Sequence, residues 1–524
     1  MWSSAANYFR REALIRSARK HAGKRMLFWL SCLVLVAAIL LGGGTHAGFL
    51  GDVAVQLLSV PLLAVSLWPA LSTRDPHREK ARLAFALCCI VALVTLVQVL
   101  PLPFDIWAGG ASLLTWPSQS DAEPQRAAWG TFSLTPQATW AAAASVIVPL
   151  SIFGAVTQLG LSHRMKLSWI LLGLGALSLL LGFMQVAQGT ESSLRFYEFT
   201  NQHEAVGFFA NRNHFAALLN VSLVLAAVWF AIIAEGAMRH GTLGSRSTLV
   251  FVAAAIFLVA IVAGLVFARS RAGILLAVFV LAGIFTIILG RRHSSSYSGV
   301  SRDLKVRRAS FAVIAFAILF AAQFGLSGLF ARQDLNPIED LRLTINRTTW
   351  QTIPKALPFG TGLGSFTGVY AAVEPPQDAM AGYVNHAHNE FSEFLLETGL
   401  IGAILLVAFL VWFARRFYAV WKQPRTSPSQ LMLERASILI IPLLLAHSLV
   451  DYPLRTTAIS AVFAFFCAIL AAPAAIEAPI DNERPHSSHR RRHGANLPVS
   501  TLPPVPEKWG TGIGWPEGWQ KREE

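Results

Sequence analysis

Two histidines stand two residues apart in a short polar segment that runs directly into an apolar stretch. The segment is Asn385-His386-Ala387-His388-Asn389-Glu390. Imidazole titrates near neutral pH, which makes His388 a candidate general base. Two other interpretations stay open. His386, His388 and Glu390 would bind a metal ion only if they converged, and an i, i+2 spacing places two imidazoles on opposite faces of a helix. His388 would otherwise have a purely structural role.

Five arginines lie at the ends of apolar stretches or in a long polar segment. They are Arg212, Arg269, Arg271, Arg347 and Arg455. A guanidinium group presents forked donors that match phosphate oxygens. If these arginines share one side of a membrane, they indicate an anionic ligand there. Each could instead pair with a nearby acid or extend toward lipid headgroups, but the short link around Arg271 contains no acidic residue.

The composition of the chain indicates the kind of scaffold that must position these residues. The chain has 524 residues, of which 54% are hydrophobic and only 14% are charged. A typical soluble domain is about 25% charged. The apolar residues fall in blocks of about 20, the length that crosses a bilayer as a helix. We therefore predict an all-α, polytopic transmembrane helical bundle, and we exclude a soluble enzyme, a secreted disulfide scaffold and a β-barrel.

Counting the apolar blocks predicts about 12 spans and their orientation. The spans are 27–45, 52–70, 83–101, 138–157, 167–187, 209–234, 248–267, 273–290, 310–328, 396–414, 436–451 and 456–474. With a cytoplasmic N-terminus, 33 of the 43 Lys and Arg residues lie inside. This excess follows the positive-inside rule and predicts that both termini are cytoplasmic. The net charge of +14 is then a property of topology, and we expect no nucleic-acid partner.

Several motifs occur in a fixed order along the second half of the chain. They are Ser270-Arg271, Arg347 followed by Trp350, Pro358–Phe366, and His388-Asn389 followed after nine residues by Gly399-Leu400-Ile401-Gly402. Two further segments are Asn211–His214 and His447–Arg455. Together they resemble the O-antigen ligase and polysaccharide polymerase superfamily, over roughly residues 205–455. The extra Arg269 before Ser270-Arg271 is a departure, and it leaves open which arginine faces the substrate.

The resemblance implies a membrane glycosyltransferase of the bacterial inner membrane. Its donor would be an oligosaccharide linked to undecaprenyl diphosphate, and its acceptor a hydroxyl of a glycan or lipid at the periplasmic face. His388 would take the proton of that hydroxyl, while Arg271 and Arg347 would hold the diphosphate. The transfer would invert the anomeric centre and need no metal and no cofactor. The further substrate-binding residues would be Arg212, Arg269, Asn389, His214 and Arg455.

The predicted organisation has four parts. Residues 1–26 form a basic cytoplasmic N-terminus, and 27–475 form the helical bundle. A large periplasmic loop, 329–395, lies between spans 9 and 10, and 476–524 form a disordered cytoplasmic tail. Within the loop, Gly360–Gly364 is expected to be a flexible turn that lets the backbone approach a ligand, with ordinary loop glycines as the alternative. A nucleotide site is a weak interpretation because no βαβ pattern surrounds it.

Other functions are compatible with the same pattern. Twelve spans with both ends inside are also common among transporters, so a lipid-linked oligosaccharide flippase or polysaccharide exporter is the main alternative. A scaffold within a glycan-assembly complex, docked through the basic tail, is another. Within the superfamily, the resemblance of Asn211–His214 and His447–Arg455 to polymerase-like members favours polymerisation over ligation or protein glycosylation.

Overall fold

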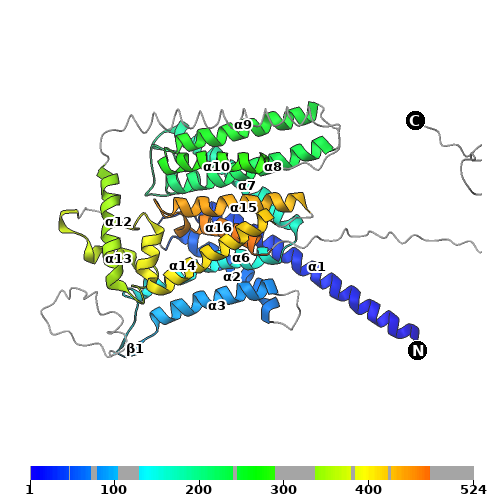
Figure 1. The fold of residues 1–524 in the computed structure, drawn as a ribbon, viewed down its shortest axis with the longest axis horizontal. Helices are drawn as coiled ribbons and strands as arrows, with labels where there is room; N and C mark the ends of the chain where they lie inside the picture. The colour runs from blue at the N-terminus through cyan, green and yellow to red at the C-terminus, as the bar shows by residue number, and fades with distance from the viewer. Residues whose placement is uncertain are drawn as a thin grey trace, which may run out of the picture. The chain divides into compact units, whose positions relative to one another are not determined.

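The computed structural model describes most of the chain. The described residues are 2–45, 48–71, 79–103, 129–239, 245–289, 337–378, 384–422 and 427–472. They are almost entirely helical (Figure 1). The strands among them are β1 (Leu102–Pro103) and β2 (Trp129–Gly130), which pair antiparallel. The predicted tail, 476–524, lies outside the described residues, so its disorder stays a prediction.

Each of the first five predicted spans corresponds to a helix or a helix pair. The helices are α1 (Trp2–Leu41), α2 (Leu50–Leu71), α3 (Glu79–Val99), α5 (Pro136–Ser145), α6 (Ile147–Gln158) and α7 (Leu161–Gln188). The helix α1 begins at Trp2, far ahead of the predicted span at 27, because nothing in the basic segment breaks the helix. The pair α5 and α6 together form the fourth span.

The second half continues the bundle and adds two helices outside it. The helices that match predicted spans are α8 (Arg212–Arg239), α9 (Ser245–Phe267), α10 (Arg271–Leu289), α14 (Glu390–Lys422), α15 (Pro428–His447) and α16 (Thr457–Ala471). The remaining elements are α12 (Pro337–Ala356), α13 (Phe366–Val373) and two 3-10 turns, η2 (Pro376–Asp378) and η3 (Pro453–Arg455). The predicted span 310–328 lies outside the described residues.

Length and hydropathy support the membrane assignment. Seven of the described helices are long and apolar enough to cross a bilayer, and four shorter apolar helices accompany them. The polytopic helical fold is therefore confirmed. The count of about 12 spans and the extent of the large loop stay predictions.

Backbone hydrogen bonds between helices identify the ends that lie together. The amide of Ala458 in α16 donates to the carbonyl of Gly42, which follows α1 (3.0 Å). The amide of Glu390, which begins α14, donates to the carbonyl of Ser448, which follows α15 (2.8 Å). We call this end, where α1 and α15 finish and α14 and α16 begin, the site end of the bundle.

A buried arginine marks the opposite end. Arg164 is only 1% exposed, and its guanidinium donates to the carbonyls of Thr157, Leu159 and Ala472 at 3.0, 2.9 and 2.5 Å. These carbonyls lie where α6 and α16 finish, and helix ends leave such groups unpaired. One side chain thus satisfies acceptors from two helices where α7 begins.

Two short helices pack against the site end. In Figure 1, α12 runs across the end of the bundle where α14 begins. Its inner face buries Ile345 and Ile353 against Phe366 of α13 and Leu396 of α14 in a separate hydrophobic cluster. The part of the predicted loop that the structure describes is therefore folded onto the bundle, and it holds the segment 384–389 at the site end.

Candidate active site

His388 is held by a buried carboxylate at the site end. Its Nδ1 lies 3.1 Å from Oδ1 of Asp451, which follows α15 and is 0% exposed. The other oxygen of Asp451 accepts a hydrogen bond from the side-chain amide of Asn213, in the first turn of α8. Three segments that are far apart in the chain therefore fix one imidazole. This pair orients the ring as a carboxylate does in histidine-based catalysis.

The backbone at His388 adopts a conformation that is unusual for a residue with a side chain. Its φ is +52°, in the left-handed region that costs energy for a non-glycine residue. Immediately after it, Asn389 accepts hydrogen bonds from the amides of Phe391 (3.1 Å) and Ser392 (3.2 Å). Asn389 is thus the cap of α14, an interaction worth about 1 kcal/mol. Its predicted contact with substrate stays a prediction.

His386 forms a second imidazole–carboxylate pair. Its Nδ1 lies 2.8 Å from Oε1 of Glu393 in α14, and the amide of Ala387 donates to Oε2 of the same carboxylate (2.9 Å). Arg455 donates to Oε2 of Glu397 (2.7 Å) and lies 3.4 Å from Oε1 of Glu393. The two histidines bind different carboxylates, and the described residues include no cluster suited to a metal ion.

Tyr452 lies among the histidines. The centre of its ring is 4.1 Å from that of His386, 5.1 Å from His388 and 4.9 Å from His214. Burial and the neighbouring charge of Asp451 raise the pKa of Tyr452 above its ordinary value, so the phenol stays neutral. Tyr452 is therefore a neutral packing partner for the imidazoles.

Burial and nearby charges act in opposite directions on Asp451. Burial alone would raise the pKa of this carboxyl, but the hydrogen bond with His388 and the charges of nearby imidazoles and of Arg342 lower it below its usual range. Asp451 is therefore a carboxylate, and it can stabilise positive charge on His388. Behind it, His214 and His447 are fully buried, and neither has a hydrogen-bond partner among the described residues. The ring of His214 packs against Tyr452, and its predicted contact with substrate stays a prediction.

Two of the predicted substrate-binding arginines pair with acids. Arg212 begins α8 and lies 2.6 Å from Oε1 of Glu204. Arg455 is paired with Glu393 and Glu397; burial would lower its pKa, but these carboxylates raise it above its usual value. The alternative that such arginines pair with acids therefore applies to both. Contacts of either with a substrate stay predictions.

The link between α9 and α10 carries two more of the predicted arginines. Arg269 is exposed and has a φ of +50°, whereas Arg271 is half-buried at the first position of α10. Ser270 accepts from the amide of Gly273 (3.1 Å), and the carbonyl of Gly273 accepts from the side chain of Asn220 in α8 (2.9 Å). The hydroxyl of Ser270 thus caps α10, and the side-chain amide of Asn220 fastens α10 to α8. Contacts of Arg269 and Arg271 with a substrate stay predictions.

The large loop presents two arginines on α12. Arg347 is exposed, and no hydrogen bond or ion pair joins it to another described residue. Arg342 is half-buried, and its charge acts on both Asp451 and Tyr452. Sequence reasoning selected Arg347 from its spacing to Trp350, whereas the arginine whose charge reaches the His388 pair is Arg342.

The glycine segment packs against protein rather than opening to a ligand. Gly399 interrupts α14 with a φ of +59°, and a Cβ there would overlap the carbonyl oxygen of Pro358. The amide of Leu400 donates to that carbonyl (2.8 Å). A Cβ at Gly360 would in turn overlap the carbonyl of Glu397. The prediction of a flexible turn that approaches a ligand was therefore wrong. Gly360 and Gly399 instead allow the backbone of the loop and the backbone of α14 to lie in contact.

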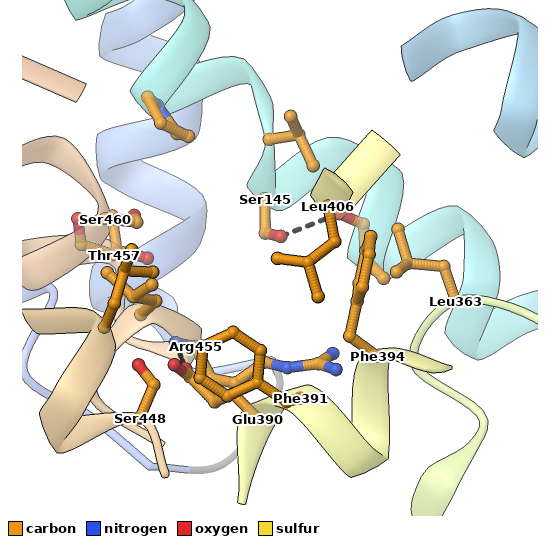
Figure 2. Close-up of a pocket in the computed structure, with 15 residues that line it drawn as sticks. Ser145, Leu363, Glu390, Phe391, Phe394, Leu406, Ser448, Arg455, Thr457 and Ser460 are labelled. Carbon is orange, nitrogen blue, oxygen red and sulfur yellow. Dashed lines mark hydrogen bonds between the residues drawn. The ribbon is translucent and has the colours of Figure 1, made fainter. Parts of the chain in front are cut away.

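A cavity of about 280 Å³ is lined by Glu390 and Arg455 at the site end. Figure 2 shows the side chain of Arg455 extending toward Phe394 along one side of the cavity. Ser145 and Leu406 lie on the opposite side. Its remaining walls come from α5, α6, α14, α15 and α16 and are mainly apolar. The cavity therefore combines hydrocarbon walls with a polar rim at the site end.

A comparison with protein families matches this part of the molecule. A family model described as O-antigen ligase matches residues 255–407. The chain carries an O-antigen ligase domain. The matched range contains Arg271, Arg347, His388 and Gly399, but it ends before Asp451. No curated protein matches the chain.

The residues that hold the two histidines were not selected by sequence reasoning as site residues. Asp451 and Asn213 orient His388, and Glu393 orients His386. One feature of the sequence could have indicated these partners. Glu390, Glu393 and Glu397 recur at three- and four-residue intervals at the start of an apolar segment, which places them on one face of a helix. Acids there need cationic or hydrogen-bonding partners. The pairing of each histidine with one carboxylate depends on tertiary structure.

Proposed function

We propose that the protein is a glycosyltransferase that moves a glycan from undecaprenyl diphosphate to an acceptor hydroxyl at the periplasmic face, as a polysaccharide polymerase or O-antigen ligase does. The observation that carries the proposal is that His388, inside the O-antigen ligase domain, is held by the buried carboxylate of Asp451. A base held in this way suits the activation of a hydroxyl nucleophile. The site end is then the periplasmic end of the bundle.

In the proposed reaction, Nε2 of His388 takes the proton of the acceptor hydroxyl. The acceptor oxygen attacks the anomeric carbon from the face opposite the diphosphate, so the configuration inverts. Asp451 stabilises the imidazolium that forms. Arg271 and Arg347 bind the diphosphate and offset the charge that grows on it as the glycosidic bond breaks. Fixed guanidinium groups supply this stabilisation, so we propose that the transfer is independent of metal.

The apolar cavity is the place we propose for the first part of the polyprenyl chain. Its walls include Phe391, Phe394 and Leu406 of α14, and hydrocarbon is favourably transferred into such a surface. Its polar rim lies beside the segment that carries the histidines. A lipid seated there would place its diphosphate end near the site end.

The proposal is tested with purified protein in lipid nanodiscs, lipid-linked oligosaccharide as donor and a glycan acceptor. The wild-type protein should form a longer or newly linked glycan. Arg271→Ala and Arg347→Ala should each raise KM for the donor or lower kcat about tenfold or more, because a charged hydrogen bond to phosphate is worth about 1.5–3 kcal/mol. Absence of transfer, with flipping of the same donor in proteoliposomes, would favour the exporter instead.

A further inference from the structure

The segment 386–388 carries two imidazole–carboxylate pairs of similar construction. The Nδ1 atoms of His386 and His388 lie 2.8 and 3.1 Å from oxygens of Glu393 and Asp451. In each pair the imidazole side chain is 18% exposed and the carboxylate side chain 1%. The proposed function uses only the pair at His388, and it leaves the second pair without a role.

Both imidazoles keep one nitrogen for a ligand. Because each Nδ1 is bound to a carboxylate, the available atom is Nε2. Neither Nε2 has a partner among the residues that the structure describes, and neither is enclosed. In a histidine with only a packing role, Nε2 would be buried, as it is in His214 and His447.

The charges around the two pairs differ. On the His386 side, Glu393 and Glu397 share one guanidinium, that of Arg455. Glu390 also faces this group, since its Oε1 accepts from the amide of Arg455 (2.8 Å). Three carboxyl groups therefore surround one guanidinium on the side of His386.

The His388 side already has a further cation. Asp451 is the carboxylate there, and the charge of Arg342 acts on it. The neutral phenol of Tyr452 lies between the two pairs, while the buried His214 and His447 face Asp451 from α8 and α15. The two imidazoles therefore have different surroundings: His386 adjoins a cluster of three carboxyl groups and one guanidinium, whereas the carboxylate beside His388 is also acted on by the charge of Arg342.

We propose that His386 donates a proton to the diphosphate oxygen that leaves the sugar, so that the site works with one imidazole as base and the other as acid. This inference rests on the proposed function. The acceptor O–H bond breaks and its proton goes to Nε2 of His388. The acceptor oxygen bonds to the anomeric carbon, while the bond from that carbon to the phosphate oxygen breaks. The proton on Nε2 of His386 then goes to the released oxygen.

Protons and charges balance over this cycle. One proton passes from the acceptor hydroxyl to the released lipid diphosphate, and both imidazoles return to their starting states by exchange with water. Inversion places the entering and leaving oxygens on opposite faces of the sugar, which two separate imidazoles suit better than one. The hydrogen bond from the amide of Ala387 to Glu393 (2.9 Å) keeps His386 fixed relative to α14.

The test is the pH profile of kcat/KM for purified full-length protein with lipid-linked oligosaccharide. An essential acid and an essential base give the wild type a bell-shaped profile. In His386→Asn the alkaline limb should disappear and the maximum should fall about 100-fold, while His388→Asn should lose the acidic limb. Glu393→Gln should move the alkaline limb to lower pH, because the carboxylate no longer stabilises the imidazolium. His203→Asn, at an exposed position, is the matched control and should keep the wild-type profile.

Two results would overturn the proposal, and they are distinguishable from each other. If His386→Asn lowers the rate evenly and keeps the alkaline limb, and Glu393→Gln leaves that limb in place, then His386 only supports the Arg455 cluster and the acid role is wrong. If the wild-type protein transfers no glycan, the proposed function itself fails. Should His386→Asn not fold, the shift in Glu393→Gln decides alone.

Discussion

The chemistry of this protein is concentrated in side chains that meet where helices end. A carboxylate such as Asp451, excluded from water, interacts strongly with an imidazole because the local dielectric constant is low. Its second oxygen is satisfied by Asn213, so the group is not left partly paired. The left-handed backbone at His388 adds a conformational cost. Such strain persists only where surrounding contacts fix it, and it is common at functional sites.

At this scale we predict the effect of removing the charge behind His388. Asp451→Asn should lower kcat by on the order of 100-fold, because the imidazolium loses its counter-charge and the ring its preferred tautomer. KM for the donor should change little, since Asp451 is fully buried and its two oxygens are bound to His388 and Asn213. Initial rates of glycan transfer measure both. Glu198→Gln, at an exposed position on the same side, is the control, and equal rates for the two variants would contradict the role of Asp451.

Individual elements show which parts of the fold are readable from sequence. Eleven of the spans predicted from hydropathy coincide with helices that the structure describes. A run of about twenty apolar residues is a local feature of the sequence, so it can be recognised without knowledge of tertiary contacts. It placed the start of one span at 396, whereas α14 begins at Glu390. The acidic residues of that first turn pair with Arg455, 65 positions from Glu390 in the chain. Pairing across such a separation has no local pattern, so the carboxylates that hold the histidines could not be predicted.

The interlocked glycines give a prediction for α14. Gly399→Ala should lower the free energy of unfolding by more than about 1 kcal/mol, because alanine tolerates a φ of +59° poorly and its Cβ would overlap the backbone at Pro358. The apparent unfolding temperature in detergent measures this. Gly173→Ala is the matched control, since a Cβ there, within α7, meets nothing within 4 Å. A Gly399→Ala protein as stable as the control would show that the two backbones need not touch.

In the part of the chain that the structure describes, two groups of buried charged side chains lie at opposite ends of the bundle. Arg164 satisfies carbonyls at one end, and the imidazole–carboxylate pairs occupy the other. The excess of Lys and Arg in alternate loops predicts that the end with Arg164 is cytoplasmic. The distribution of charge along the sequence thus predicts the orientation of the bundle in the membrane.

The orientation is testable by cysteine labelling in intact cells. In a background whose four native cysteines are replaced by serine, Glu198→Cys should react with a maleimide that does not cross the membrane. Lys166→Cys, beside Arg164 at the other end, should react only after permeabilisation. Both positions are exposed. The reverse pattern would place the histidines in the cytoplasm and contradict a periplasmic reaction.

The most direct measurement is the single-turnover rate of glycan transfer by His388→Ala, compared with wild type and His203→Ala, together with the affinity of each protein for the lipid-linked donor. Removing the base should slow the chemical step by at least about 100-fold and leave donor affinity within about twofold of wild type, since His388 acts on the acceptor. His203→Ala should match wild type in both. A His388→Ala protein that transfers glycan at the wild-type rate would contradict the account.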